Sequence, residues 1–141
     1  MTNDLQIMPI MDSSTPKAFS YPPITVERAR RSLICSPFHL KLFETMRSQS
    51  VSLSAIANET GVKYGYTKKP LSELAGDNEL GWLIQVGVLR REVDGQGITD
   101  SFRLTPLGHQ LIEEYQGKSL PVASWRDRLY DTVIRWFRLP F

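Results

Sequence analysis

Residues 87–108, GVLRREVDGQGITDSFRLTPLG, constrain the fold of this 141-residue chain more than any other stretch. Residues 88–93 and 98–104 are rich in β-branched and apolar side chains, and the connection between them contains two glycines. Two runs of this kind, joined by a short glycine-containing connection, predict a β-hairpin.

Both ends of the hairpin carry helix-boundary residues. Gly87 is suited to the position just after a helix, where a positive φ costs least without a Cβ atom. Thr105 can cap a following helix, and Pro106 can take its first position, where a missing N–H costs nothing. Alternation along the strands then predicts four core-facing side chains: Leu89, Ile98, Phe102 and Leu104.

Helical spacing of apolar residues predicts several helices upstream of the hairpin. Thr25 can cap a first helix that runs to about Ile34, and Ser36-Pro37 can open a second that ends near Ser48. Residues 51–61 have the pattern of the first helix of a helix-turn-helix, ended by Gly61. After a long connection, residues 71–75 look helical, and Gly76-Asp77 is expected to separate them from a further helix over 78–86.

This order of elements resembles the winged-helix superfamily over about residues 25–116. The motifs SLSAIANETGV and VGVLRREVDGQGITDSFRLTPLG carry the resemblance. It implies an α+β, mostly helical fold: a winged helix-turn-helix with a two-stranded wing and an added C-terminal amphipathic helix. The whole chain, with CSPFHLKLFETMRSQSV, GYTKKPLSEL and a terminal WFRLPF, also resembles a small, uncharacterised cyanobacterial protein family. Winged helices serve DNA binding, dimerisation and protein docking alike, so the fold leaves the function open.

Composition divides the chain into four parts. Residues 1–23 contain four prolines and no apolar period, which indicates a flexible N-terminal tail. The winged-helix domain is expected over 24–116, a linker over 117–123 and the amphipathic helix over 124–139. The absence of a secretory signal and of any long apolar run favours a cytoplasmic location.

The C-terminal helix has the clearest amphipathic pattern in the sequence. One half of its helical wheel is apolar and contains Tyr130 and Ile134 together with the expected partner- or membrane-binding residues: Trp125, Leu129, Val133, Trp136 and Phe137. Arg128, Arg135 and Arg138 lie on the other half and are expected to face water. Three arrangements stay open for the apolar half: packing on the domain, pairing with a second copy, or lying on a membrane surface.

The pattern for DNA recognition is incomplete. Residues 71–86, the equivalent of the base-reading helix, contain three carboxylates and no Lys or Arg. Phosphate and base contacts would have to come from the loop before that helix and from the wing. These candidate nucleic-acid-binding residues are Lys63, Tyr64, Tyr66, Lys68, Lys69, Arg90, Arg91 and Arg103. In the loop, the alternative is a solvated connection with its tyrosines folded onto the domain. On the wing, Glu92, Asp94 and Asp100 lie among the arginines, so the alternative is paired surface charges.

No constellation for catalysis is present in the sequence. His39 and His109 are isolated, and Cys35, the single cysteine, lies in an apolar context typical of a buried structural thiol. We therefore expect no enzyme activity, no metal, no cofactor and no small-molecule substrate. A net charge of +2 is too small to indicate which class of partner the protein binds.

Two functions follow from these patterns. The first is a DNA-binding, transcription-regulator-like factor that holds DNA weakly through phosphate contacts. The alternative is an interaction adaptor that uses the winged helix to dock a protein partner or a second copy, with peripheral membrane contact through its C-terminal helix.

Overall fold

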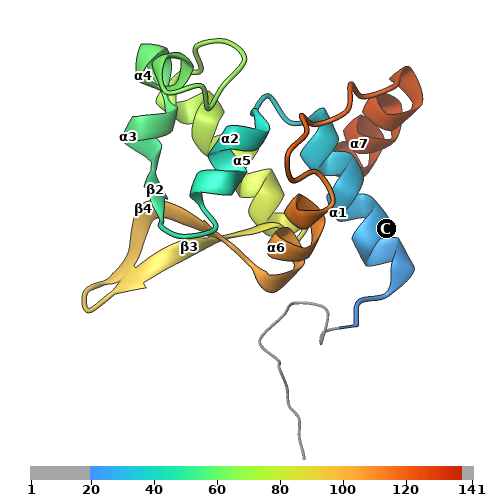
Figure 1. The fold of residues 1–141 in the computed structure, drawn as a ribbon, viewed down its shortest axis with the longest axis horizontal. Coiled ribbons are helices and arrows are strands. Elements are labelled where there is room, and N and C mark those ends of the chain that lie inside the picture. Colours follow the sequence, from blue (N-terminus) through green and yellow to red (C-terminus); the bar gives the residue numbers. More distant parts are fainter. Residues whose placement is uncertain (1–19, 138–141) are drawn as a thin grey trace, which may run out of the picture.

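The computed structural model describes residues 20–137 of the chain. Within this range the fold is α+β and mostly helical, with a three-stranded antiparallel sheet at one end (Figure 1). Its elements follow in the order α1 (Pro23–Cys35), α2 (Leu40–Thr45), β2 (Val51–Ser52), α3 (Leu53–Ile56), α4 (Asn58–Lys63), α5 (Glu73–Gln85), β3 (Leu89–Asp94), β4 (Gly97–Leu104), α6 (Pro106–Glu113) and α7 (Trp125–Phe137). Helices, then a short strand, then helices and a hairpin form a winged-helix-like arrangement, as predicted.

The predicted hairpin is confirmed. β3 and β4 pair antiparallel around the two-residue turn 95–96, and β2 adds a third strand in the order β2-β4-β3. Phe102 lies at the centre of this sheet, opposite Val51 on one side and Arg91 on the other. Phe102 is fully buried, which attaches the base of the hairpin to the core.

For one hairpin residue, Ile98, the predicted burial is wrong. Leu89, Phe102 and Leu104 are buried, but Ile98 is 74% exposed. The pairing shifts between Arg91 and Val93, where β4 advances by four residues while β3 advances by two. The tip of the hairpin also extends past the helices (Figure 1), so no core is present for Ile98 to join.

The helix boundaries around the hairpin are confirmed. Gly87 has a φ of +93° directly after the end of α5, a conformation that favours glycine. Thr105 caps α6: its hydroxyl oxygen accepts from the Gly108 N–H at 3.0 Å, and Pro106 takes the first helical position. The same hydroxyl contacts the Gly87 carbonyl, which ties the two ends of the hairpin together.

The first two helices begin at residues other than those predicted. α1 starts at Pro23, because proline suits a first turn, so this residue belongs to the helix and not to the tail; residues 1–19 lie outside the described range. Ser36 ends α1 instead of opening the next helix, since its hydroxyl donates to the Leu33 carbonyl at 2.7 Å. α2 therefore begins only at Leu40.

The segment 51–61 is not one helix. Its first two residues form β2, and the remainder breaks into α3 and α4 at Ala57, whose backbone is extended. Gly61 lies inside α4, where a Cβ atom would stand 1.8 Å from the Ile56 carbonyl oxygen. The glycine thus permits a close approach of α4 to the end of α3 and does not terminate a helix.

Conversely, the predicted break at Gly76-Asp77 does not exist. α5 is continuous and capped by Ser72, whose hydroxyl accepts from the Ala75 N–H at 3.1 Å. Gly76 is buried in this helix, and a Cβ there would meet the Leu53 side chain at 3.4 Å. Tertiary packing against α3 thus offsets the roughly 1 kcal/mol that glycine costs in a helix.

Candidate functional site

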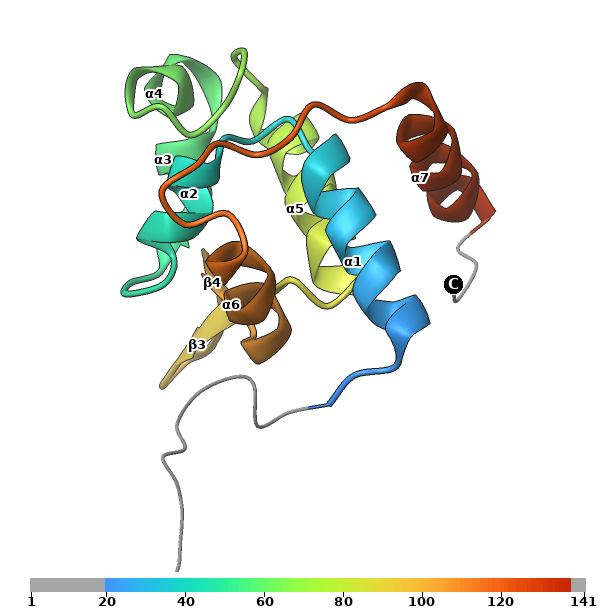
Figure 2. The same cartoon turned by 45° about the vertical axis from the view of Figure 1, so that its right-hand side comes forward.

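The C-terminal helix α7 lies at the edge of the molecule beside α1 (Figures 1 and 2). Ser124 and Asp127 form a reciprocal cap at its start: the Asp127 N–H donates to Ser124 Oγ at 3.2 Å, and the Ser124 N–H donates to Asp127 Oδ2 at 3.3 Å. The helix is therefore well defined locally, and its function depends on which face it turns toward the domain.

A buried polar cluster attaches α7 to the domain. Ser32 of α1 donates its hydroxyl hydrogen to Asp131 Oδ1 at 2.8 Å and accepts from Trp82 Nε1 of α5 at 3.0 Å. The indole N–H also reaches Asp131 Oδ1 at 3.2 Å. Ser32 and Trp82 are buried, so each polar group needs its partner. We call Ser32, Trp82 and Asp131 the polar clamp.

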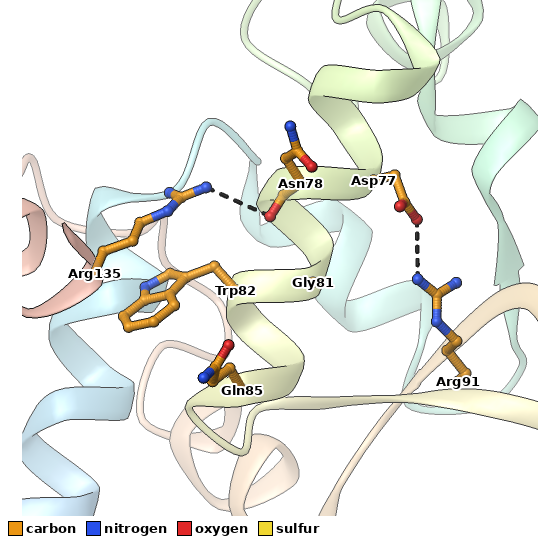
Figure 3. A pocket seen from close by; sticks show the side chains of 7 residues that line it. All are labelled: Asp77, Asn78, Gly81, Trp82, Gln85, Arg91 and Arg135. Carbon is orange, nitrogen blue, oxygen red and sulfur yellow. Dashed lines mark hydrogen bonds and ion pairs between the residues drawn. The ribbon is translucent and has the colours of Figure 1, made fainter. Parts of the chain in front are cut away.

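Two more residues of α7 complete this attachment. Ile134, next to the clamp on the helix surface, is only 2% exposed. Arg135 forms an ion pair with Glu79 at 2.9 Å and lies over the Trp82 ring at 5.7 Å. Figure 3 shows its guanidinium reaching the Asn78 carbonyl along α5. The expectation that Arg135 faces water is therefore wrong; Arg128 is exposed as predicted, and Arg138 lies outside the described residues.

The clamp rotates the apolar half of α7 outward. Trp125 is 70% exposed, Trp136 79% and Phe137 70%, and their neighbours on this face are exposed as well. We call this surface the apolar stripe; it consists of Trp125, Leu129, Tyr130, Val133, Trp136 and Phe137. Of the three arrangements open from the sequence, packing of this face on its own domain is thus wrong. Isolated apolar residues are common on surfaces, whereas large contiguous sets are typical of interaction sites, so the stripe is the candidate site of this chain.

Cations flank the stripe. Arg126 is exposed, with its guanidinium 5.7 Å from the Trp125 ring, and Arg31 of α1 lies 5.1 Å from the Tyr130 ring. Arg128 borders a cavity of about 320 Å³ that Lys68 and Lys69 also line. Of the two α7 carboxylates, Asp131 is turned toward the domain in the clamp, and Asp127 is hydrogen-bonded in the helix cap.

The predicted loop cations are on the surface and the loop itself is anchored. Lys63, Tyr64, Lys68 and Lys69 are exposed, whereas Tyr66 packs partly against the core. The Tyr66 carbonyl accepts from the His39 N–H at 2.9 Å, and the Lys68 N–H donates to the Pro37 carbonyl at 3.0 Å. The loop is thus attached to the segment between α1 and α2, close to the start of α7.

The wing arginines are paired with carboxylates. Arg91 meets Asp77 of α5 at 3.0 Å (Figure 3), and Glu92 faces Arg103 at 3.1 Å and Arg90 at 3.6 Å. In both Figures 1 and 2 the hairpin and the 63–69 loop lie at different ends of the molecule. The structure therefore separates the two groups of predicted nucleic-acid-binding residues.

The outward face of α5 borders an open polar groove of about 490 Å³ (Figure 3). Arg135 lines one side and Arg91 the other, and both guanidinium groups are already paired with carboxylates of α5. Gly81 leaves the floor open, as a Cβ there would meet nothing within 4 Å. This is the surface that would read bases in a DNA-binding winged helix, and it carries no unpaired cation among its lining residues.

Two of the titratable groups singled out in the sequence, Cys35 and His109, have shifted pKa values. Burial, with a contribution from Asp131 and Asp127, raises the pKa of the Cys35 thiol to about 11, which keeps it protonated and unreactive at neutral pH. Burial lowers the pKa of His109. Residues 20–137 contain no group of three or more His, Cys, Asp or Glu side chains that could hold a metal ion.

The sequence pattern predicts the apolar stripe but not the polar clamp. A buried tryptophan usually finds a hydrogen-bond acceptor for its N–H, so Trp82 did signal a partner. Nothing in the local pattern identified that partner, because Ser32 and Asp131 are 99 residues apart and Trp82 is 49 residues from Asp131.

Comparison with known proteins identifies a family. Residues 19–135 match the model of the family described as Npun_F0494-like, whose name derives from a cyanobacterium. This agrees with the predicted resemblance to a cyanobacterial family. No curated protein and no solved structure matches the chain, and the likeness to the winged-helix superfamily therefore rests on the arrangement of the elements alone. Since the match covers most of its length, the chain belongs to the Npun_F0494-like family.

Proposed function

We propose that the protein is a cytoplasmic, non-enzymatic docking module whose interaction surface is the apolar stripe of α7. The observation that carries this proposal is the orientation of α7, with a polar clamp on its inner side and exposed aromatic side chains on its outer side. A helix that needed only to cover the domain would turn its apolar half inward. Exposing several large aromatic side chains is costly unless a partner covers them.

The geometry favours this function over DNA reading. α5 has carboxylates where a reading helix has cations, and its Asp77 and Glu79 already pair with Arg91 and Arg135. Phosphates brought to this face would meet neutralised arginines and the remaining carboxylate of Glu73.

The docking function is tested in extracts of cells that make the full chain. We expect the wild type to distribute between free monomer and larger or membrane-bound material. The double variant Trp125→Ser, Trp136→Ser should shift to free monomer, because each aromatic anchor at an interface contributes about 2 kcal/mol, roughly 30-fold in affinity. Sedimentation and gel filtration measure the two fractions.

The matched control removes equally exposed apolar residues outside the stripe. Leu74→Ser with Ile98→Ser changes two side chains that are 72% and 74% exposed, and should distribute as the wild type does. If the stripe variant and the wild type distribute identically, the stripe is not a docking surface.

DNA binding is the second candidate function. The exposed lysines Lys63, Lys68 and Lys69 support it, together with Tyr64 on the same loop, since cations interleaved with aromatic rings can hold phosphates and stack bases. Such contacts carry no sequence information.

For this candidate we expect weak, salt-sensitive binding without sequence preference. Changing Lys63, Lys68 and Lys69 together to Ala should lower the slope of log K against log salt by about two to three units. Arg103→Ala serves as control and should leave the slope unchanged, because Glu92 already neutralises this arginine. Fluorescence anisotropy across a salt series measures both. Tight binding to one sequence at physiological salt, insensitive to the triple change, would contradict this expectation.

A further inference from the structure

We infer that the partner of the apolar stripe is an anionic lipid surface, on which α7 lies parallel to the membrane plane. This inference rests on the docking function proposed above and specifies its partner. Three features carry it: the composition of the stripe, the sign of the charges around it, and its area.

The composition of the stripe fits the interfacial region of a bilayer. Tryptophan, phenylalanine and leucine on one face of a helix, with arginines beside them, are typical of helices that sit at the boundary between headgroups and acyl chains. Arg126 lies over the Trp125 ring, from where its long side chain can extend to the headgroups. No helix within residues 20–137 is long and apolar enough to cross a membrane, so the contact we infer is peripheral.

The charges near the stripe are positive. Arg126 and Arg31 lie over two of its aromatic rings, and Arg128 lies with Lys68 and Lys69 around the cavity beside the first turns of α7. The sequence of α7 also contains Asp127 and Asp131, which would repel anionic lipid if they shared this surface. Asp131 is instead engaged with the domain in the clamp, and Asp127 is hydrogen-bonded in the helix cap, so the exposed charged side chains of α7 nearest the stripe are those of Arg126 and Arg128. The positive charges around the stripe therefore attract the phosphates of anionic lipid headgroups.

A second copy of the chain fits the stripe less well. A helix of 13 residues is about 20 Å long, and its face presents on the order of 500 Å². A stable dimer buries roughly 800 Å² on each partner. Pairing two stripes about a two-fold axis would also bring the flanking arginines of both copies together, which opposes association.

The polar clamp gives the lipid contact a defined geometry. Because Asp131 and Ile134 hold the inner side of α7, the stripe faces outward before any membrane is present. Binding then needs no refolding of the helix, and the rest of the domain stays on the aqueous side.

The inference is tested with the purified full chain and with vesicles of two compositions, phosphatidylcholine alone and phosphatidylcholine containing phosphatidylglycerol. Flotation measures the bound fraction, and a blue shift of tryptophan emission reports burial of the stripe. We expect binding to the anionic vesicles above all. Trp125→Ser with Trp136→Ser should lower the partition coefficient by more than tenfold, because it removes the inserted area.

Charge is tested separately from apolar contact. Each cation near an anionic bilayer contributes about fivefold to partitioning, so Arg126→Ala with Arg128→Ala should lower binding to the anionic vesicles by roughly 25-fold. Lys63→Ala with Arg90→Ala removes the same charge from α4 and β3, which lie apart from α7 in Figures 1 and 2, and should have little effect. Circular dichroism checks that every variant is folded, which their exposed positions favour.

The outcomes separate the two proposals. Loss of binding in both α7 variants, with normal binding in the control, supports the lipid surface. No vesicle binding, together with self-association that the tryptophan changes abolish, overturns the lipid inference and leaves the docking function, with a second copy as partner. Equal binding of wild type and tryptophan variant to anionic vesicles also overturns the inference, since contact would then be made elsewhere.

Discussion

We expect Phe102→Ala to lower the free energy of unfolding by about 3–5 kcal/mol. Phe102 is fully buried in the central strand of the sheet, between Val51 and Arg91 on the neighbouring strands. Truncation would leave a cavity where the hairpin meets the helices, and the guanidinium of Arg91, 4.9 Å from the ring, would lose the surface it lies on. Urea denaturation followed by circular dichroism measures the change.

Ile98→Ala is the matched control in the same strand. Ile98 is 74% exposed at the tip of the hairpin, so this variant should stay within about 0.5 kcal/mol of the wild type. A large loss for Ile98→Ala and a small one for Phe102→Ala would contradict the burial of Phe102 and the exposure of Ile98.

Gly61→Ala should have a comparably large effect for a different reason. A Cβ at this position would lie 1.8 Å from the Ile56 carbonyl oxygen and 3.0 Å from Thr67 Oγ1. The first of these atoms belongs to the backbone, so the clash can be relieved only by moving α4 away from α3. We expect a loss of more than about 3 kcal/mol, at the upper end for overpacked sites. The midpoint of thermal unfolding measures it.

Gly81→Ala is the same chemical change, but we expect it to raise the free energy of unfolding. A Cβ at Gly81 meets nothing within 4 Å, and the residue lies within α5. Alanine is the better helix former, so this variant should gain about 0.5–1 kcal/mol. If both alanine variants changed stability in the same direction, the close approach of α4 to α3 would not be the reason for glycine at position 61.

The role of a glycine in or beside a helix is only partly predictable from the sequence. Each glycine is compatible with a helix end, a break or a close approach, and only the surrounding atoms decide among them. Gly87, by contrast, was predicted correctly, since the hairpin that follows it requires the helix to end there. Gly61 and Gly76 were predicted to end or break helices and instead lie inside them, where tertiary neighbours set their role.

The candidate site likewise has features that local sequence predicts and features that tertiary contacts set. Its six stripe residues followed from helical periodicity, because residues three and four apart share a face whatever the rest of the chain does. The sequence also predicts the loop and wing cations and offers Glu92 as a partner for the wing arginines. The separation of these cations into two groups and the pairing of Arg91 with Asp77 depend on contacts between distant elements.

Local features of this protein thus follow from the sequence alone: the Thr105 cap of α6, the hairpin and the amphipathic character of α7. Backbone hydrogen bonding and side-chain periodicity act over a few residues, so they are readable locally. The side of α7 that faces outward depends instead on contacts between distant elements. A periodic pattern states that an apolar face exists, whereas the pairing of Asp131 with Ser32 and Trp82 across the fold turns that face away from the domain.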